Sequence, residues 1–222
     1  MTRPRIALDV RLYLVTGPGP RGRDLVDVVE AAVAGGVTLV QLRDKSAGPA
    51  GRLRQVVRLR RVLDPWGVPL VVDDDLGAAA GAAGVHLGPF DPAPTRARAV
   101  LGPHAVVGWS VEHPAQLVAA GDAFDYAAAS PVWTTPSKTD TAPSLGLSGV
   151  RAVRRALDPR VPLVGIGGID EANAGDVVSA GCDGVAVVSA VCAADDPEAA
   201  ARDLRRAVDS ARAARGAREV TP

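Results

Sequence analysis

The chain has 222 residues, with 25 basic and 25 acidic side chains that balance to a formal net charge of zero. Balanced, dispersed charge argues against nucleic acid or a membrane surface as a partner, and no apolar run approaches the ~18 residues of a membrane-spanning helix. Two cysteines, Cys182 and Cys192, are too few for a disulfide framework, so we expect both to be buried thiols. We therefore expect a soluble, cytoplasmic protein, with its oligomeric state, monomer or homo-oligomer, left open.

Short apolar runs alternate with amphipathic segments along the chain. The runs typical of strands begin near Leu12, Thr38, Pro69, Gly84, Ala105, Tyr126, Pro162 and Gly184. Helical patterns lie between them, among them Asp24–Ala34, Ala50–Leu63, Pro114–Ala120, Ser148–Leu157 and Glu171–Ala180, and a last pattern spans Pro197–Ala214. Hydrophobic residues make up 47% of the chain and aromatic ones only 3%, so aliphatic side chains must fill the core, as suits buried parallel strands.

Eight strand–helix alternations predict an α/β fold, a single-domain (β/α)8 TIM barrel over residues 1–222, with 215–222 as a flexible tail. The alternative is a doubly wound sheet with a phosphate-binding turn after the first strand. The run Gly17-Pro18-Gly19-Pro20 is glycine-rich there, but its prolines remove amide donors that such a turn needs. We therefore favour the barrel, in which function lies at the carboxyl ends of the strands.

Cationic side chains follow the second predicted strand, in the segment Gln41-Leu42-Arg43-Asp44-Lys45. Because side chains alternate along a strand, Gln41, Arg43 and Lys45 share one direction. Three donors, two of them cationic, indicate an anion site, and surface salt bridging is the alternative interpretation.

Carboxylates follow the third and fourth predicted strands. Asp73, Asp74 and Asp75 are adjacent in sequence and repel one another unless a cation or solvent relieves them. An N-cap for the next helix accounts for one carboxylate, and a divalent cation, shared with Asp91, accounts for the others. Mg²⁺ is commonly held by one or two carboxylates plus substrate phosphates, so we predict a Mg²⁺ site. For His86, inside the fourth strand, we favour close packing over a ligand or proton-shuttle role.

Hydroxyl groups and a lysine follow the fifth and sixth predicted strands. Ser110 ends the fifth strand, and the polar segment Thr134–Pro143 after the sixth is a candidate lid. That segment contains Lys138, which with Lys45 makes up all the lysine in the chain. Retaining lysine at two positions suggests that a compact ammonium is needed at both.

A glycine pair, Gly167 and Gly168, follows the seventh strand, and Ser189 ends the eighth. Backbone amides in these two loops, with a helix N-terminus, form the usual phosphate site of such barrels. The strand ends therefore offer two anion sites, one cationic and metal-assisted and one built from backbone. A reaction that joins a diphosphate to a phosphate-bearing partner would use both.

Four segments, Val40–Lys45, Gly84–Gly88, Val164–Ile169 and Val185–Ser189, together resemble the thiamine-phosphate synthase (thiamine-phosphate pyrophosphorylase) family, with a likeness from Leu12 to Val191. The resemblance implies a transferase of thiamine biosynthesis that uses one Mg²⁺ per active site. Such enzymes couple an aminopyrimidine methyl diphosphate to a thiazole phosphate and release pyrophosphate. The implied mechanism is dissociative: the diphosphate leaves, and the thiazole nitrogen attacks the pyrimidine-methyl cation without any protein nucleophile.

The resemblance also assigns residues. The pyrimidine diphosphate would contact Gln41, Leu42, Arg43, Asp44, Lys45, Asp73, Ser110 and Lys138. The thiazole phosphate would contact Thr135, Pro136, Ser137, Gly168, Val188 and Ser189. Asp74 and Asp91 would bind Mg²⁺, while Arg43, Lys45, Lys138 and Ser110 would act in catalysis.

Several positions depart from the family pattern. Asp73 stands where the family has Asn, and Pro89 where it has Gln. Ser130 and Thr134 replace the usual Gly and Pro around strand six, and Ser137 replaces the commoner Thr. Two alternative functions follow: a thiazole tautomerase of the same fold, whose members generally lack the full carboxylate and lysine set, or a non-catalytic protein that binds phosphorylated ligands.

Overall fold

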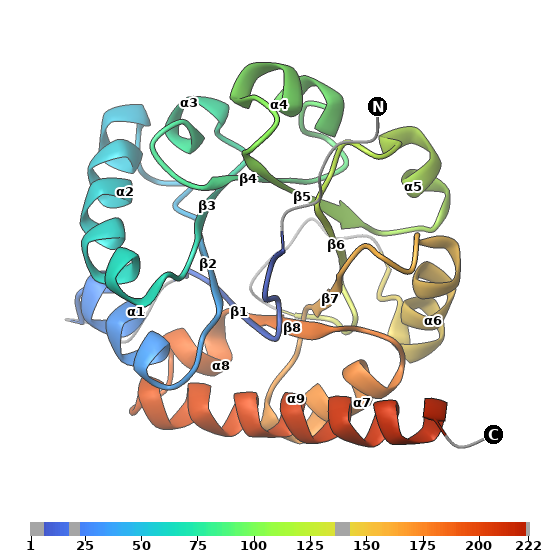
Figure 1. Ribbon diagram of the computed structural model, residues 1–222. Coiled ribbons are helices and arrows are strands. Elements are labelled where there is room, and N and C mark those ends of the chain that lie inside the picture. Colours follow the sequence, from blue (N-terminus) through green and yellow to red (C-terminus); the bar gives the residue numbers. More distant parts are fainter. Residues whose placement is uncertain (1–6, 18–22, 136–142, 221–222) are drawn as a thin grey trace.

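The computed structural model describes residues 7–17, 23–135 and 143–220, which form a closed barrel of eight parallel strands inside a ring of helices (Figure 1). The strands are β1 Leu12–Val15, β2 Leu39–Leu42, β3 Leu70–Asp73, β4 Gly84–Leu87, β5 Val106–Val111, β6 Tyr126–Ala129, β7 Leu163–Ile166 and β8 Gly184–Val187. They pair in chain order, and β8 closes on β1 with Leu12 opposite Val185. The (β/α)8 prediction is confirmed, and every expected strand start lies within one residue of the observed one.

The helices connect successive strands on the outside of the barrel. They are α1 Leu25–Ala34, α2 Pro49–Leu63, α3 Leu76–Ala79, α4 Pro94–Leu101, α5 Ala115–Ala120, α6 Gly146–Ala156, α7 Glu171–Ser179, α8 Ser189–Cys192 and α9 Pro197–Val220, with a 3₁₀ turn, η1, at Asp64–Trp66. Local sequence fixes several starts. Asp24 and Asp170 accept hydrogen bonds from the first free amides of α1 and α7, and Pro49 begins α2, where its missing amide hydrogen costs nothing.

Residues 215–220, which we expected to belong to a flexible tail, are helical, and residues 221–222 lie outside the described residues. Helix α9 continues to Val220 and lies against α7 and α1 along the lower edge of Figure 1. Arg215 donates to the carbonyl oxygens of Val178 and Cys182, and it pairs with Asp183 at 2.9 Å. The alternation of arginine and alanine therefore extends a packed helix, because a long guanidinium side chain can reach across to the barrel.

Side-chain alternation along the strands divides the core in two. One set, including Tyr13, Val71, Tyr126 and Val164, fills the barrel interior, and the larger set packs between sheet and helices. Cys182 and Cys192 are buried and free, as predicted. None of the described helices is long and apolar enough to span a bilayer.

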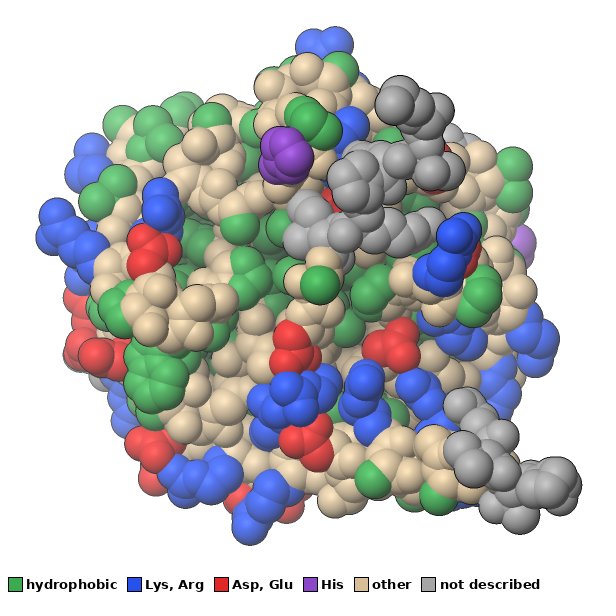
Figure 2. All heavy atoms as spheres, viewed as in Figure 1, with side chains coloured by type: hydrophobic (Ala, Val, Ile, Leu, Met, Phe, Trp, Pro, Cys, Tyr) green, Lys and Arg blue, Asp and Glu red, His purple; other side chains and the backbone are tan. Residues whose placement is uncertain are grey.

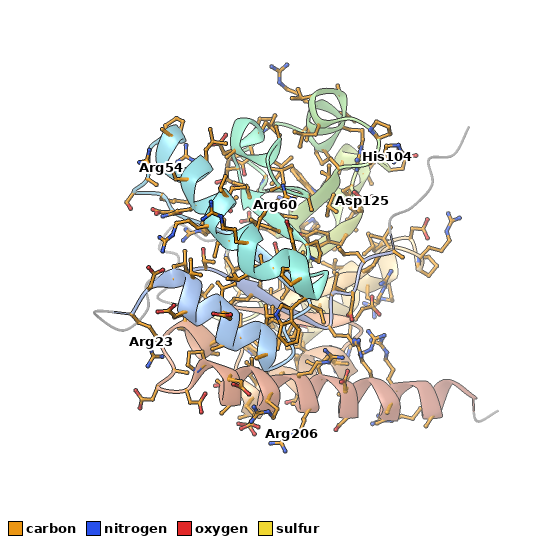
Figure 3. All side chains as sticks on the ribbon, turned by 60° about the vertical axis from the view of Figure 1, so that its left-hand side comes forward. Arg23, Arg54, Arg60, His104, Asp125 and Arg206 are labelled. Atoms are coloured by element: carbon orange, nitrogen blue, oxygen red, sulfur yellow. The ribbon has the colours of Figure 1, made fainter. Side chains whose placement is uncertain are left out.

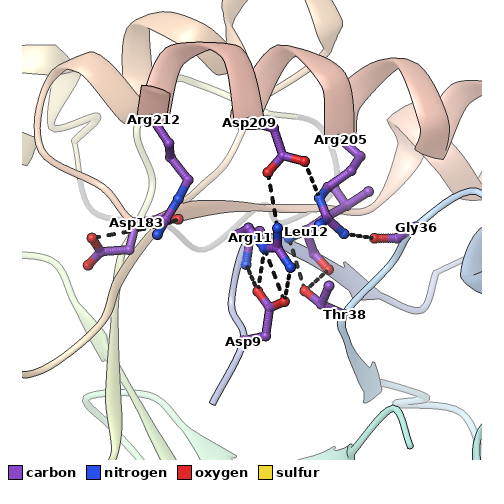
Figure 4. Close-up of polar contacts among 9 residues, drawn as sticks. All are labelled: Asp9, Arg11, Leu12, Gly36, Thr38, Asp183, Arg205, Asp209 and Arg212. Carbon is purple, nitrogen blue, oxygen red and sulfur yellow. Dashed lines mark hydrogen bonds and ion pairs between the residues drawn. The ribbon is translucent and has the colours of Figure 1, made fainter. Parts of the chain in front are cut away.

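Ion pairs join the amino-terminal end of the barrel to α9 (Figure 4). Arg11, just before β1, bonds Asp9 and lies 3.4 Å from Asp209, which also accepts from Arg205 at 2.8 Å. Arg205 in turn donates to the carbonyl oxygen of Gly36 at 3.0 Å. Basic and acidic side chains are interleaved over α9 on the face shown in Figure 2. Arg54 on α2 and Arg206 on α9 are exposed, and Arg23, just before α1, donates to the carbonyl oxygens of Ala194 and Asp195 (Figure 3).

Candidate active site

A cavity of about 620 Å³ opens at the carboxyl ends of the strands. Its wall includes one residue from each strand in order: Val15, Gln41, Asp73, His86, Ser110, Ala128, Ile166 and Ala186. Residues from the loops after β2, β3, β4, β6, β7 and β8 complete it. A site built from all eight strand ends can present several ligand-binding groups to one molecule.

Within the described part of the chain, the loop after β2 supplies the lysine and arginine side chains of this cavity. Gln41, Arg43 and Lys45 all line it, as their shared strand direction predicts. Arg43 Nε lies 3.6 Å from Asp73 Oδ2, and Lys45 Nζ lies 3.8 Å from Asp74 Oδ2. The Lys45 side chain is 62% exposed, so its ammonium is accessible to an entering anion.

The other two residues of this segment face away from the cavity. Leu42 is buried in the layer between sheet and helices. The Asp44 carboxylate accepts hydrogen bonds from Ser46, the Ala47 amide and Gln55, and these bonds lower its pKa to about 2. The structure therefore gives Leu42 a packing role and Asp44 a loop-fixing role, with neither side chain placed at the expected diphosphate site.

Carboxylates gather opposite these cations. Asp74 has a φ of 60°, an uncommon value outside glycine, at the turn between β3 and α3. Burial, a hydrogen bond with Asp91 and repulsion from Asp73 and Asp91 raise the pKa of Asp74 to about 8. Burial also raises the pKa of Asp73, although Arg43 and Lys45 oppose this effect. Ionising closely spaced, partly buried carboxyl groups is unfavourable, and a bound cation would offset this cost. These carboxylates are therefore suited to binding a cation.

The third acid of the run has a structural role. Asp75 accepts hydrogen bonds from the amides of Gly77 and Ala78 and so caps α3, which confirms the predicted N-cap. No group of three or more potential ligands of the His, Cys, Asp or Glu type surrounds a common point within the described residues. Within the described residues, the carboxylates that line the cavity are those of Asp73, Asp74, Asp91 and Asp170. Asp170 caps α7 from the opposite wall, so Asp73, Asp74 and Asp91 are the carboxylates beside the cations of the β2 loop.

The loops after β6, β7 and β8 form the opposite wall. Gly167 and Gly168 have φ values of 106° and 64°, which glycine adopts without strain. A Cβ atom at Gly167 would collide with Pro131, so the missing side chain also lets the β6 and β7 loops approach. The Trp133 amide donates to the Gly167 carbonyl at 3.1 Å and joins these loops. Thr135, Gly168, Val188 and Ser189 all line the cavity here, and Ser189 begins the short helix α8.

Three of the predicted site residues, Pro136, Ser137 and Lys138, lie outside the described residues. Sequence reasoning missed others. Tyr13 and Tyr126 are fully buried inside the barrel and meet His86, whose two ring nitrogens contact Tyr126 and Ser110. The packing role favoured for His86 is therefore incomplete, because this residue lines the cavity through polar contacts.

Phe90, at 95% exposure, lines the same cavity between Pro89 and Asp91. The only sequence signal for it was a large apolar residue in a loop next to a predicted metal ligand. Pro89, which departs from the family pattern, also lines the cavity.

A closed barrel with cations, crowded carboxylates and a glycine-rich loop around one cavity defines a TIM-barrel enzyme that acts on small phosphorylated molecules. The family model for thiamine monophosphate synthase matches residues 12–191. The chain therefore belongs to the thiamine monophosphate synthase family, and it is a transferase of thiamine biosynthesis.

Relatives match over almost their whole length. The chain is 50% identical to a thiamine-phosphate synthase of Albidiferax ferrireducens over 205 residues, covering 90% of this chain and 93% of that protein. It is 49% identical to a thiamine-phosphate synthase of Xanthobacter autotrophicus, covering 92% and 98%. Among solved structures, a thiamine phosphate pyrophosphorylase from Pyrococcus furiosus superposes with a TM-score of 0.81 at 32% identity, covering 91% of this chain and 97% of that one.

Proposed function

We propose that this protein couples an aminopyrimidine methyl diphosphate to a thiazole phosphate, releasing pyrophosphate and forming thiamine phosphate. The observation that carries the proposal is one cavity with two unlike walls, each lined by groups suited to an anion. Arg43 and Lys45 lie on one wall, and the glycine-rich loop after β7 with the end of β8 lies on the other. A diphosphate on the first wall and a phosphate monoester on the second would place the two heterocycles between them.

In the reaction, the bond between the pyrimidine methylene carbon and the diphosphate oxygen breaks, and its electron pair leaves with the diphosphate. The lone pair of the thiazole nitrogen then forms the new carbon–nitrogen bond. Arg43 and Lys45 would stabilise the negative charge that grows on the leaving diphosphate. We assign the same role to Lys138, and we assign positioning of the pyrimidine to Gln41 and Ser110.

The donor set fits the Mg²⁺ that this family implies. Burial and the neighbouring Asp91 and Asp73 make the negative charge of Asp74 costly, and a bound cation would offset that cost. Two carboxylates are sufficient protein ligands for Mg²⁺ when substrate phosphates and water complete its coordination. When bound, the ion would neutralise diphosphate charge and help to orient the leaving group.

The test is pyrophosphate release by the purified protein, with each substrate omitted in turn and with chelator in place of Mg²⁺. Release that requires both substrates and the metal supports the proposal. Isomerisation of the thiazole phosphate without pyrophosphate release would instead indicate a tautomerase, and binding of both substrates without turnover would indicate a non-catalytic protein. Asp73→Asn, which restores the usual family residue, is the matched variant for either negative result.

A further inference from the structure

A chain of hydrogen bonds runs across the floor of the cavity from Gln41 to Ser110. Gln41 Nε2 donates to Tyr13 Oη at 2.5 Å, and Tyr13 Oη lies 2.8 Å from Tyr126 Oη. Tyr126 Oη lies 2.8 Å from His86 Nδ1, and His86 Nε2 lies 2.9 Å from Ser110 Oγ. The chain links β2, β1, β6, β4 and β5, and so joins two residues assigned to the pyrimidine substrate through three that have no assigned role.

The middle of this chain is enclosed. Tyr13 is 1% exposed and Tyr126 is fully buried, and burial raises the pKa of both hydroxyls above their usual range. Both groups therefore keep their hydrogens over the whole working range of pH. The His86 and Tyr126 rings are stacked with centroids 5.5 Å apart, and the Tyr13 ring meets Tyr126 edge-on.

The backbone of β5 makes room for the contact between Tyr126 and His86. Gly108 lies beside it, and a Cβ atom there would overlap both the Tyr126 hydroxyl and His86 Nδ1. Only glycine leaves space for these two atoms to meet without displacement of a ring. The contact is thus built into the strand as well as into the two side chains.

Counting the available hydrogens shows which atom donates and which accepts in each bond of this hydrogen-bond chain. Tyr13 Oη accepts the amide hydrogen of Gln41, and its own single hydrogen then has Tyr126 Oη as its acceptor. If Tyr126 instead donated to Tyr13, the Tyr13 hydroxyl hydrogen would have no acceptor among the polar atoms that contact it within the described structure. A buried donor without an acceptor is costly and therefore rare.

The same count continues to the cavity. Since Tyr126 accepts from Tyr13, it donates its hydrogen to His86 Nδ1, which must then be the unprotonated nitrogen. A neutral His86 carries its hydrogen on Nε2 and donates it to Ser110 Oγ. The Ser110 hydroxyl hydrogen is left over, and Ser110 lines the cavity. A Gln41 amide turned the other way would reverse every bond and make Ser110 present lone pairs instead.

We propose that Tyr13, Tyr126 and His86 are positioning residues that hold His86 in its Nε2–H tautomer and leave Ser110 as a hydrogen-bond donor into the cavity. Its acceptor would be a ring nitrogen or a phosphate oxygen of the pyrimidine diphosphate. The identity of this acceptor rests on the proposed function, whereas the His86 tautomer does not.

The first experiment measures the tautomer by ¹⁵N NMR of histidine-labelled protein without substrate. The protein has three histidines. Replacing the two in exposed loops, with His104→Gln and His113→Gln, assigns the remaining signals to His86. We expect one bare nitrogen at Nδ1 and one protonated nitrogen at Nε2. A hydrogen on Nδ1, or on both nitrogens, would overturn the proposal whether or not the protein proves to be a synthase.

The second experiment removes the contact to His86 with Tyr126→Phe and compares it with Val164→Ala, which alters the same barrel core but leaves the chain intact. In Tyr126→Phe we expect a mixture of His86 tautomers. We also expect a KM for the pyrimidine diphosphate raised about tenfold, the effect of one oriented hydrogen bond, with the KM for the thiazole phosphate unchanged. Val164→Ala should leave the tautomer and both KM values as in the wild type.

Two results would refute the role of Tyr126. One is a single Nε2–H tautomer that persists in Tyr126→Phe, because the tautomer would then be fixed elsewhere. The other is an equal rise in both KM values, which a general loss of packing produces. If Tyr126→Phe does not fold, Tyr13→Phe interrupts the same chain one step earlier and carries the same expectations.

Discussion

Asp75, the neighbour of Asp74, stabilises the turn between β3 and α3 in two ways, by capping α3 and by pairing with Arg52. Replacing Asp75 in two different ways separates these contributions. Asp75 caps α3 through the amides of Gly77 and Ala78 and accepts from Arg52 Nε at 2.7 Å. The Asp75 and Arg52 side chains are 22% and 23% exposed, so their pairing is only partly screened by water. Asp75→Ala removes both the cap and the ion pair, whereas Asp75→Asn removes the charge but keeps an oxygen that can cap.

The expected losses follow from these contacts. Loss of an N-cap costs about 1 kcal/mol, and loss of the partly exposed ion pair costs up to about 1 kcal/mol. Asp75→Ala should therefore lower the free energy of unfolding by ~2 kcal/mol, or the melting temperature by roughly 4–8 °C in a protein of this size. Asp75→Asn should lose about half as much.

The pH dependence has a definite sign. Burial disfavours the Asp75 carboxylate, but the α3 amides and Arg52 outweigh burial and lower its pKa. A lowered pKa stabilises the fold above the ordinary carboxyl range, and this contribution disappears as the pH falls through that range. The difference in stability between the wild type and Asp75→Asn should therefore be largest near neutrality and shrink below about pH 4.

Urea unfolding at pH 7 and at acid pH measures these differences. Asp64→Asn is the control, because its pair with Arg60 is exposed and should contribute no more than about 0.5 kcal/mol. Because the turn holds Asp74, Asp75→Ala should also need more Mg²⁺ for half-maximal pyrophosphate release. If Asp75→Asn is as unstable as Asp75→Ala, the cap contributes nothing and the reasoning fails.

Three further variants test the two walls of the cavity. Asp74→Asn should reduce Mg²⁺-dependent pyrophosphate release by at least ~100-fold yet keep thiazole phosphate binding in calorimetry; loss of both would contradict the metal assignment. Lys138→Ala should lower kcat far more than it weakens thiazole phosphate binding, and equal losses would refute its diphosphate role. Gly168→Ala forces a side chain into a φ of 64°, so it should cost about 1–2 kcal/mol in stability and raise the KM for thiazole phosphate; an unchanged KM would remove Gly168 from the site.

Among the departures from the family pattern, Asp73 is the one whose effect on the charge of the site the structure explains best. Its carboxylate lies near Arg43 and adds to the repulsion that raises the pKa of Asp74. The chain thus carries an additional carboxylate beside Arg43 and next to the predicted metal ligand Asp74. Such a charge favours a metal ion but opposes a diphosphate.

The local sequence determined the strands and helices and many of the side chains that they direct into the cavity. Periodicity predicted the strand starts and the shared direction of Gln41, Arg43 and Lys45, because it depends on residues a few positions apart. Capping chemistry predicted that one carboxylate after the third strand caps a helix, and the structure identifies it as Asp75. Parallel-barrel topology then brings the strand ends together, so the cavity wall was predictable once eight alternations had been counted.

Only the tertiary structure decided which side chains meet inside the barrel. Tyr13 and Tyr126 are separated by 113 positions in sequence, and their contact depends on barrel closure and strand register, which no local pattern encodes. The continuation of α9 past residue 214 likewise depends on carbonyl groups of α7 and its following loop that accept from Arg215. Sequence specified the elements because their signals are local, and the fold specified the hydrogen-bonded floor of the site because its partners are distant.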